Sequence, residues 1–141
     1  MKKIITASVL ALTLSGCAGL EFQPPAKGKP YAVYTSDNEP KYLASCLARE
    51  WGTYDPLILH SYKPDYWGYS VDTVGFKDGE SADVYRKNGK SVINFYAASD
   101  SNKKRLKERI NAMVKANKFC VNAELGEAPT KRDADGKIVL W

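Results

Sequence analysis

The sequence predicts an α+β domain, a two-layer sandwich in which two helices cover one face of an antiparallel sheet of four to five strands. Two segments place apolar residues at helical spacing, and the segments between them are short and rich in β-branched and aromatic residues. Asn88-Gly89 lies between two alternating runs and favours a two-residue hairpin. The predicted order of elements is therefore β-α-β-β-β-β-α.

The first two predicted elements are a short strand and a helix. Residues 31–35 form a run of β-favouring residues, and the polar residues 36–38 offer N-caps for the helix. Pro40 suits the first helical turn, and Gly52 is expected to end the helix. The buried stripe of this helix is expected to contain Leu43, Cys46 and Leu47.

Four further strands are expected to form a meander. They are predicted over residues 57–62, 69–76, 81–86 and 91–97. A two-residue turn at 88–89 pairs Val84 with Ile93 and Ala82 with Phe95. This register places the four apolar residues on one face of the sheet.

A second hairpin is predicted at the Asp-Gly pair at 78–79. A two-residue turn there would place Lys77 opposite Glu80. The same register would put Val74 and Phe76 on the face opposite the apolar residues of the next strand, so it fits a single apolar face less well.

The second helix is expected after residues 99–101, which offer N-caps. Its apolar stripe would contain Leu106, Ile110, Met113 and Val114. Its other faces carry the basic residues Lys103, Lys104, Arg105, Lys107 and Arg109. Such a run can attract anionic lipid headgroups or other polyanions. Glu108 and the narrow apolar stripe favour the alternative, an ordinary solvated helix face.

The N-terminal residues have the organisation of an export signal. Two lysines precede an apolar run at 4–14, which is too short to cross a membrane as a helix. Leu-Ser-Gly-Cys at 14–17 then resembles the lipobox of bacterial lipoproteins, in which an aliphatic residue and two small residues precede a cysteine. The resemblance implies that residues 1–16 are removed and that Cys17 becomes the lipidated N-terminus. The alternative is an ordinary secretory signal with an incidental cysteine.

This resemblance concerns processing and location, not activity. It implies a diacylglycerol on the Cys17 thiol and an acyl chain on its amine, and two or more chains hold a protein stably at a membrane. In Gram-negative members of this class, an aspartate after the cysteine commonly retains the protein in the inner membrane. Ala18 stands at that position, which implies the outer membrane if the source has one.

The chain is expected to have four regions. Residues 1–16 are a signal peptide, 17–29 a lipidated N-terminus and flexible tether, 30–121 a globular domain, and 122–141 a polar tail with a short apolar end. The tether assignment rests on adjacent prolines, two glycines and the absence of periodicity.

Two cysteines remain once Cys17 is lipidated. An exported protein folds in an oxidising compartment, so a disulfide between Cys46 and Cys120 is expected to tie the two helices together. A metal site or a catalytic thiol is the alternative. His60 is the only histidine in the chain, and neither cysteine has a close partner in sequence, so neither alternative has support.

The sequence carries none of the common motifs for catalysis, phosphate binding or metal binding. No catalytic residue, metal or cofactor is therefore predicted beyond the covalent lipid on Cys17. The net charge of +5 is spread over basic residues interleaved with acids in an exported protein. Nucleic acid is consequently not an expected partner.

Aromatic residues mark a possible binding surface. Four of them lie in residues 62–69 around an expected strand-to-strand loop, and aromatic side chains with polar tips are common in protein and glycan contacts. Alternatively, Trp67 and Tyr69 fold inward as core. A second row, on the other face of the sheet, would contain Tyr85, Val92 and Tyr96. The full candidate surface is Tyr62, Tyr66, Trp67, Tyr69, Tyr85, Tyr96 and Trp141.

The chain ends with four apolar residues at 138–141, after the polar stretch 122–136. Such a run is expected to form a short extended segment that pairs with a sheet edge. It would dock on its own domain, over the second aromatic row, or add a strand to a partner. Its high effective concentration favours docking on its own domain.

These features together predict a membrane-anchored envelope lipoprotein that acts as a non-catalytic binding or assembly module for a protein or glycan partner. One alternative is a small periplasmic hydrolase or glycan-active enzyme with its site in the aromatic loop. A deep cleft with two close carboxylates would support it. A second alternative is a surface lipoprotein that blocks a receptor or phage.

Overall fold

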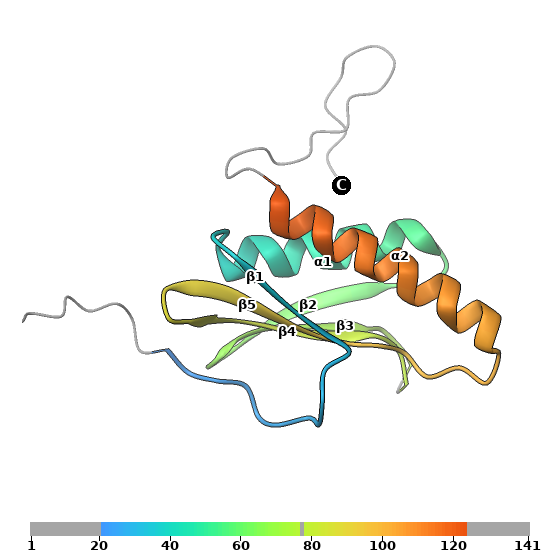
Figure 1. Ribbon diagram of the computed structural model, residues 1–141, viewed down its shortest axis with the longest axis horizontal. Coiled ribbons are helices and arrows are strands. Elements are labelled where there is room, and N and C mark those ends of the chain that lie inside the picture. Colours follow the sequence, from blue (N-terminus) through green and yellow to red (C-terminus); the bar gives the residue numbers. More distant parts are fainter. Residues whose placement is uncertain (1–20, 77, 124–141) are drawn as a thin grey trace, which may run out of the picture.

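The computed structural model describes residues 21–76 and 78–123, and it confirms the predicted α+β fold. An antiparallel sheet has the strand order β1-β5-β4-β3-β2, and both helices lie on one of its faces (Figure 1). In chain order the elements are β1 (Ala32–Ser36), α1 (Pro40–Tyr54), β2 (His60–Asp65), β3 (Gly68–Thr73), β4 (Ser81–Lys87), β5 (Lys90–Tyr96) and α2 (Lys103–Asn122).

The β4–β5 hairpin has the predicted register. Val84 pairs with Ile93 and Ala82 with Phe95, and all four are fully buried on the helix side of the sheet. The turn at 88–89 has φ angles of 53° and 76°, as the Asn-Gly pair predicts, because a type I′ turn needs positive φ at both positions.

The prediction of a tight hairpin at 78–79 is wrong. β3 ends at Thr73, Asp72 pairs with Ser81, and a longer connection joins β3 to β4. In this register Val71 lies opposite Ala82, which keeps the apolar face continuous. Burial of that face therefore decides the register, and the predicted pairing across the Asp-Gly turn is lost. The remaining residues of the predicted strand, including Val74 and Phe76, lie in the connection and are exposed.

Two element ends also differ from the prediction. Gly52 does not end α1, because it lacks the positive φ of a glycine C-cap, and the helix continues to Tyr54. β2 starts at His60 instead of 57. An Asp55 side-chain oxygen accepts the Leu57 amide at 3.0 Å, which forms a turn in place of the strand start.

The predicted helix caps are replaced by neighbouring residues. Glu39 is the N-cap of α1, while Asn38 donates to the backbone oxygens of Cys120 and Ala123 at the end of α2. At the start of α2, the Asn102 side chain accepts the Arg105 amide at 3.0 Å. The predicted N-caps at 36–38 and 99–101 are therefore wrong: Glu39 stands at the start of α1 without a side-chain cap hydrogen bond, and Asn102 caps α2.

The main core lies between the sheet and the helices. From α1 it contains the predicted stripe together with Ala44 and Trp51. α2 buries Met113, Asn117 and Cys120, whereas the other predicted stripe residues are only partly buried. The Trp51 indole donates to the Asn117 side-chain oxygen at 2.8 Å, so this polar pair is satisfied inside the core.

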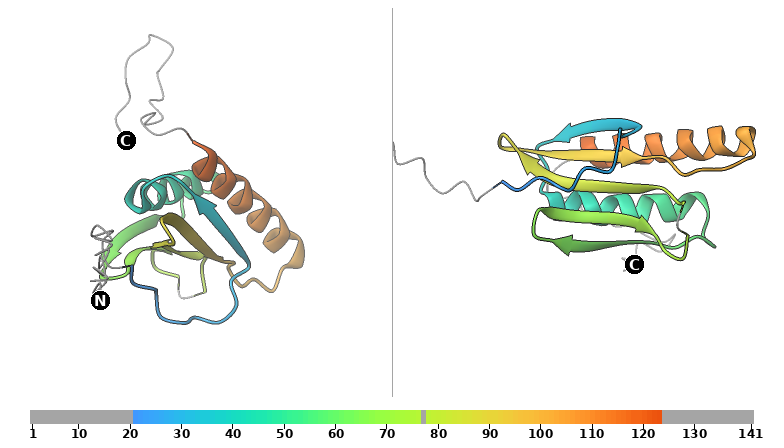
Figure 2. Two further views of the ribbon diagram at one scale, coloured as in Figure 1. Left: turned by 60° about the vertical axis from the view of Figure 1, so that its left-hand side comes forward. Right: turned by 90° about the horizontal axis from the view of Figure 1, so that it is seen from below.

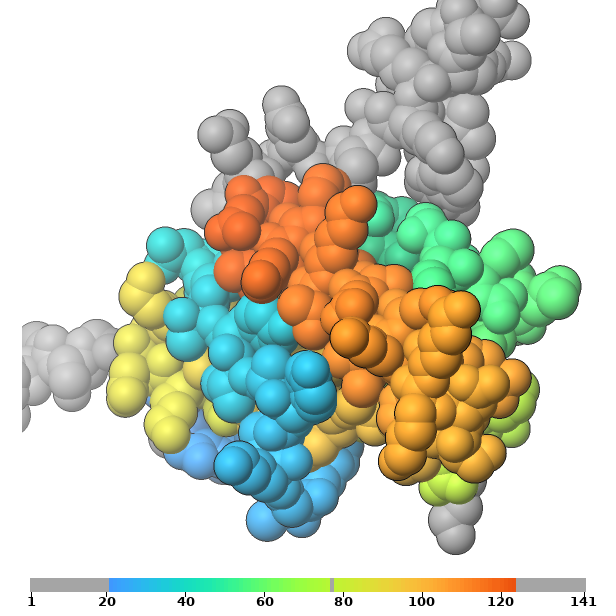
Figure 3. All heavy atoms as spheres, turned by 45° about the vertical axis from the view of Figure 1, so that its right-hand side comes forward, coloured from blue at the N-terminus to red at the C-terminus, as the bar shows by residue number. Residues whose placement is uncertain are grey.

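A disulfide joins Cys46 of α1 to Cys120, as predicted, with Cα atoms 5.8 Å apart. Cys120 lies within α2, which continues to Asn122. Figure 3 shows α2, in orange, lying beside the cyan residues of β1, where it forms an outer wall of the domain. Among the described residues, no helix has the length and apolar character needed to cross a membrane.

The face of the sheet away from the helices is crossed by the N-terminal segment. Residues 21–30 take no regular secondary structure and run beneath the sheet before β1 (Figure 2). Lys27 in this segment forms an ion pair with the buried Asp83 of β4, and its Nζ lies 5.7 Å from the centre of the Tyr96 ring. The signal sequence, Cys17, Trp141 and the proposed docking segment at 138–141 lie outside the described residues.

Candidate binding groove

The structure divides the predicted aromatic surface between the two faces of the sheet. Tyr62 and Tyr69 are neighbours across β2 and β3, with ring centres 6.2 Å apart, and Tyr69 packs against the main core. Tyr66 in the β2–β3 turn is 71% exposed, whereas Trp67 beside it is 6% exposed. The predicted residues therefore do not form one continuous surface.

Trp67 belongs to a small cluster on the face away from the helices. It packs with Tyr85 and Val92, which pair across β4 and β5 as the sequence predicts. Gly68 permits this, because a Cβ at that position would lie 2.2 Å from the Val84 carbonyl oxygen. Tyr96 is half-buried on the same face, beneath Lys27.

A groove of about 600 Å³ opens at the end of the sheet where Tyr66 lies. Its walls come from the β2–β3 turn, the first turn of α1, the β4–β5 hairpin and the start of the described N-terminal segment. From the predicted surface it contains Tyr66, Trp67 and Tyr69. These segments lie far apart in the sequence, and only the fold brings them together.

The N-terminal segment contacts this groove through Glu21 and Phe22. The two carboxylate oxygens of Glu21 accept the backbone amides of Asn88 and Gly89 at 2.7 and 3.0 Å. These amides lower the pKa of Glu21 below its usual value. The Phe22 ring makes an edge contact with Tyr66, with centres 6.0 Å apart.

Arg86 also lines the groove and supports the hairpin turn. It donates to the Gly89 carbonyl oxygen at 3.1 Å and pairs with Glu39 at the start of α1. It also contributes to the lowered pKa of Glu21. The turn is therefore fixed by a cation and presents its amides to an anion.

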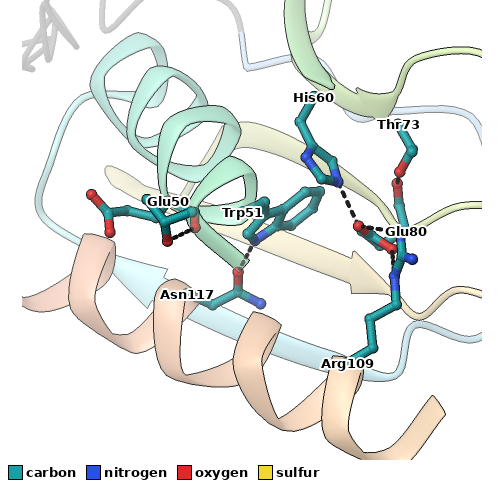
Figure 4. Close-up of polar contacts among 8 residues, drawn as sticks. Glu50, Trp51, His60, Thr73, Glu80, Arg109 and Asn117 are labelled. Carbon is teal, nitrogen blue, oxygen red and sulfur yellow. Dashed lines mark hydrogen bonds and ion pairs between the residues drawn. The ribbon is translucent and has the colours of Figure 1, made fainter. Parts of the chain in front are cut away.

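A second polar cluster lies at the opposite end of the sheet, on the helix side (Figure 4). Glu80 accepts two hydrogen bonds from the Arg109 guanidinium at 2.7 and 2.8 Å, and His60 Nε2 lies 2.5 Å from the same carboxylate. The side chains of His60 and Glu80 are each 1% exposed. Burial raises the pKa of Glu80, but the hydrogen bonds from His60 and Arg109 outweigh it and hold the pKa at about 2.

This cluster favours a structural role. Its members come from β2, the β3–β4 connection and α2, and the ring of Trp51 makes an edge contact with His60. Thr73 donates to the backbone oxygen of Glu80 at 2.9 Å, which fixes the connection. Both carboxylate oxygens of Glu80 are occupied and buried, so the group is poorly placed to accept a proton from a substrate.

Sequence reasoning missed this cluster. Its partners are 20 and 29 residues from Glu80, and no motif links them. The sequence favours a solvated position for Arg109 among the basic residues of the second helix, yet this side chain pairs with a buried acid. Arg105, which is exposed, is paired as well, with Asp100, while the lysines of that run are exposed.

No group of three or more histidine, cysteine, aspartate or glutamate side chains in the described part of the chain is placed to hold a metal ion. Comparisons with protein-family models, with curated proteins and with solved structures find no match for this chain.

Proposed function

We propose that this chain is an envelope lipoprotein whose domain is a non-catalytic binding or assembly module, and that the groove at the Tyr66 end receives its partner. The observation that carries the proposal is the position of Glu21. Its carboxylate is held at the rim of the groove by the hairpin amides. The groove therefore lies where the domain meets its N-terminal anchor.

Chain length supports placing this groove near a membrane. Cys17 is four positions before Glu21, and four extended residues span at most about 14 Å. A lipid on Cys17 would hold the hairpin turn and Tyr66 close to the lipid headgroups. A partner in or on the membrane would then meet this end of the domain first.

The character of the groove suits binding better than catalysis. Tyr66 offers an exposed aromatic surface with a polar tip. The acids of the rim already have partners: Glu39 pairs with Arg86, and an Asp65 oxygen accepts the Tyr66 amide at 2.7 Å. Aromatic and arginine side chains at such a site are typical of protein interfaces.

Photo-crosslinking in the native membrane tests this proposal. A photoreactive phenylalanine analogue would replace Tyr66 in the full-length chain, and the matched control would replace Phe119, an exposed aromatic residue on α2. We expect a discrete crosslinked partner at 66 and not at 119. Equal products at both positions, or none at 66, would contradict the proposal.

The lipid anchor is tested separately. Cys17→Ala is expected to give a chain without the mass of the acyl groups and without membrane attachment, because the thiol is the site of lipidation. Intact mass and fractionation of both forms measure this. A wild-type chain whose mature form lacks any acyl mass would refute the anchor, while the crosslinking result would still decide the role of the groove.

A further inference from the structure

Glu21 and Phe22 occupy the rim of the groove as a bound dipeptide would. Glu21 places its carboxylate on two backbone amides, and Phe22 places its ring against Tyr66. Neither residue belongs to a strand or helix. The contacts are therefore made by side chains of an irregular segment and not by backbone pairing.

The carboxylate position is a preformed anion site. Successive backbone amides in a turn can form a concave nest that binds an anion. The positive φ angles of Asn88 and Gly89 fix this turn, and Arg86 donates a hydrogen bond to the Gly89 carbonyl oxygen. The same dipeptide that sets the hairpin register thus presents two donors that the β4–β5 ladder does not use.

The aromatic position is shallow. Phe22 is 47% exposed and Tyr66 is 71% exposed, so their edge contact buries only part of each ring. Glu21 and Phe22 line the groove and do not fill it, and about 600 Å³ of space remains beside them. A longer segment with the same two groups would make more contacts than this dipeptide does.

We propose that the groove binds an extended segment of a partner protein in which a carboxylate side chain adjoins an aromatic one, and that Glu21-Phe22 is its intramolecular occupant. Charge complementarity selects the carboxylate, because the two amides and Arg86 favour an anion. Tyr66 selects the aromatic neighbour. This inference rests on the proposed binding function, for which it names the class of partner, and it does not depend on the lipid.

The intramolecular occupant competes with the partner. Glu21 and Phe22 belong to the same chain as the groove and precede Lys27, which is itself held at Asp83, so their effective concentration at the groove is high and they weaken binding from outside. Removing the carboxylate and the ring from positions 21 and 22 should therefore strengthen binding of an added peptide. Loss of one charge-assisted contact alone corresponds to about a tenfold change.

The probe is an acetylated, fluorescent peptide with the sequence Gly-Leu-Glu-Phe-Gln-Pro-Pro, which is that of residues 19–25. Its anisotropy is measured against the full-length chain in detergent, as wild type and as the double variant E21Q/F22A. We expect the double variant to bind the probe about tenfold more tightly or better. A peptide with glutamine in place of glutamate should lose this gain.

Two variants of exposed residues complete the experiment. One changes the groove, and the other changes α2 and is the matched control. In the E21Q/F22A background, Tyr66→Ala should weaken probe binding, and Phe119→Ala should leave it unchanged. Absence of binding to the double variant, or equal binding of the glutamine peptide, would overturn the inference. So would dimers of the wild-type chain that E21Q/F22A abolishes, because the occupant would then be a second copy.

Failure here is distinguishable from failure of the proposed function. A discrete crosslink at position 66 without probe binding would leave the binding function standing and remove only the acidic-aromatic partner class. Probe binding without any crosslink at 66 would leave the acidic-aromatic site standing and contradict the proposed function, which places the partner in the native membrane.

Discussion

A buried carboxyl group lies on each side of the sheet, and the pKa values of the two groups are shifted in opposite directions. On the helix side, Glu80 is satisfied by His60 and by both donors of Arg109. These partners come from a strand and a helix that the core fixes in place. Burial alone would raise the pKa of Glu80, yet the hydrogen bonds bring it down to about 2.

On the other face, Asp83 has a single partner. Lys27, from the irregular N-terminal segment, donates to one carboxylate oxygen at 2.7 Å, and the second oxygen is buried without a hydrogen bond within the described residues. Burial raises the pKa of Asp83, and Lys27 counters only part of this effect. Both side chains are buried carboxyl groups. The one with more hydrogen-bond donors has its charged form favoured, and the one with a single donor has its neutral form favoured.

The two faces of the sheet are covered by different kinds of contact. The helix side is closed by regular elements, a disulfide and a fully paired acid. The other side is crossed by a segment that side-chain contacts hold, including those of Glu21 at the groove. We therefore expect substitutions on the helix side to act on stability, and substitutions of Glu21 and Phe22 in the N-terminal segment to act on binding.

The disulfide should give the largest effect on stability. Its cysteines are 74 residues apart, and the chain-entropy model gives a loss of up to about 4 kcal/mol when such a bond is removed. The double variant C46A/C120A, compared with wild type by urea unfolding, measures this loss. Crosslinking at Tyr66 should persist under native conditions, because the bond lies on the helix side. A loss well below about 1 kcal/mol would show that the helix cover does not need its covalent link.

Glu80→Gln should have the next largest effect. It should lower the free energy of unfolding by about 3 kcal/mol at neutral pH, because it leaves Arg109 and His60 without the carboxylate. The folded pKa of Glu80 is below the unfolded value of 4.5, so its contribution is complete above that value and is lost as the pH falls toward 2. The difference in unfolding free energy between wild type and variant should therefore shrink in acid.

Unfolding curves at several pH values test this expectation. Glu108→Gln, which changes an exposed glutamate of α2, is the matched control and should have little effect at any pH. A Glu80→Gln loss that stays constant down to pH 2 would contradict the assigned charge of this acid.

On the face of the sheet away from the helices, the pH dependence of the unfolding free energy should have the opposite sign and a smaller size. Because burial raises the folded pKa of Asp83, its charged form opposes folding, and acidification through that pKa relieves the opposition. Lys27→Met should cost about 1 kcal/mol, since it leaves the buried carboxylate without its donor. Asp83→Asn should be neutral or stabilising. The double variant should recover the loss, and urea unfolding of all four forms completes the cycle.

Local signals explain what the sequence predicted correctly. Helical spacing, β-rich runs and the Asn-Gly turn act over a few residues, so they fix the element order and the β4–β5 register. The disulfide follows from two cysteines in a chain whose sequence predicts export. These inferences need no knowledge of how distant elements meet.

The rest depended on distant contacts. Glu80 lies just after an Asp-Gly pair that suggests a tight turn, and only burial against Arg109 and His60 reveals its role. The Pro-rich composition of the N-terminal segment gives no sign that Glu21 reaches the hairpin 67 residues away. For Tyr66 and Trp67, a shift of one residue changes the face, so the sequence could not say which one is buried.

Within that adjacent pair, Tyr66→Ala gives the smallest expected effect on stability, and its contrast with Trp67→Ala tests the comparison most directly. Tyr66→Ala should change the unfolding free energy by less than about 0.5 kcal/mol, because the ring is 71% exposed. Trp67→Ala, one residue on, removes a ring that packs with Tyr85 and Val92, and should cost about 3 kcal/mol or more. Urea unfolding measures both variants, and binding of the acidic-aromatic probe, in the E21Q/F22A background, supplies the second readout. If Tyr66→Ala destabilises the domain as much as Trp67→Ala does, Tyr66 is part of the fold and the groove loses its exposed aromatic contact.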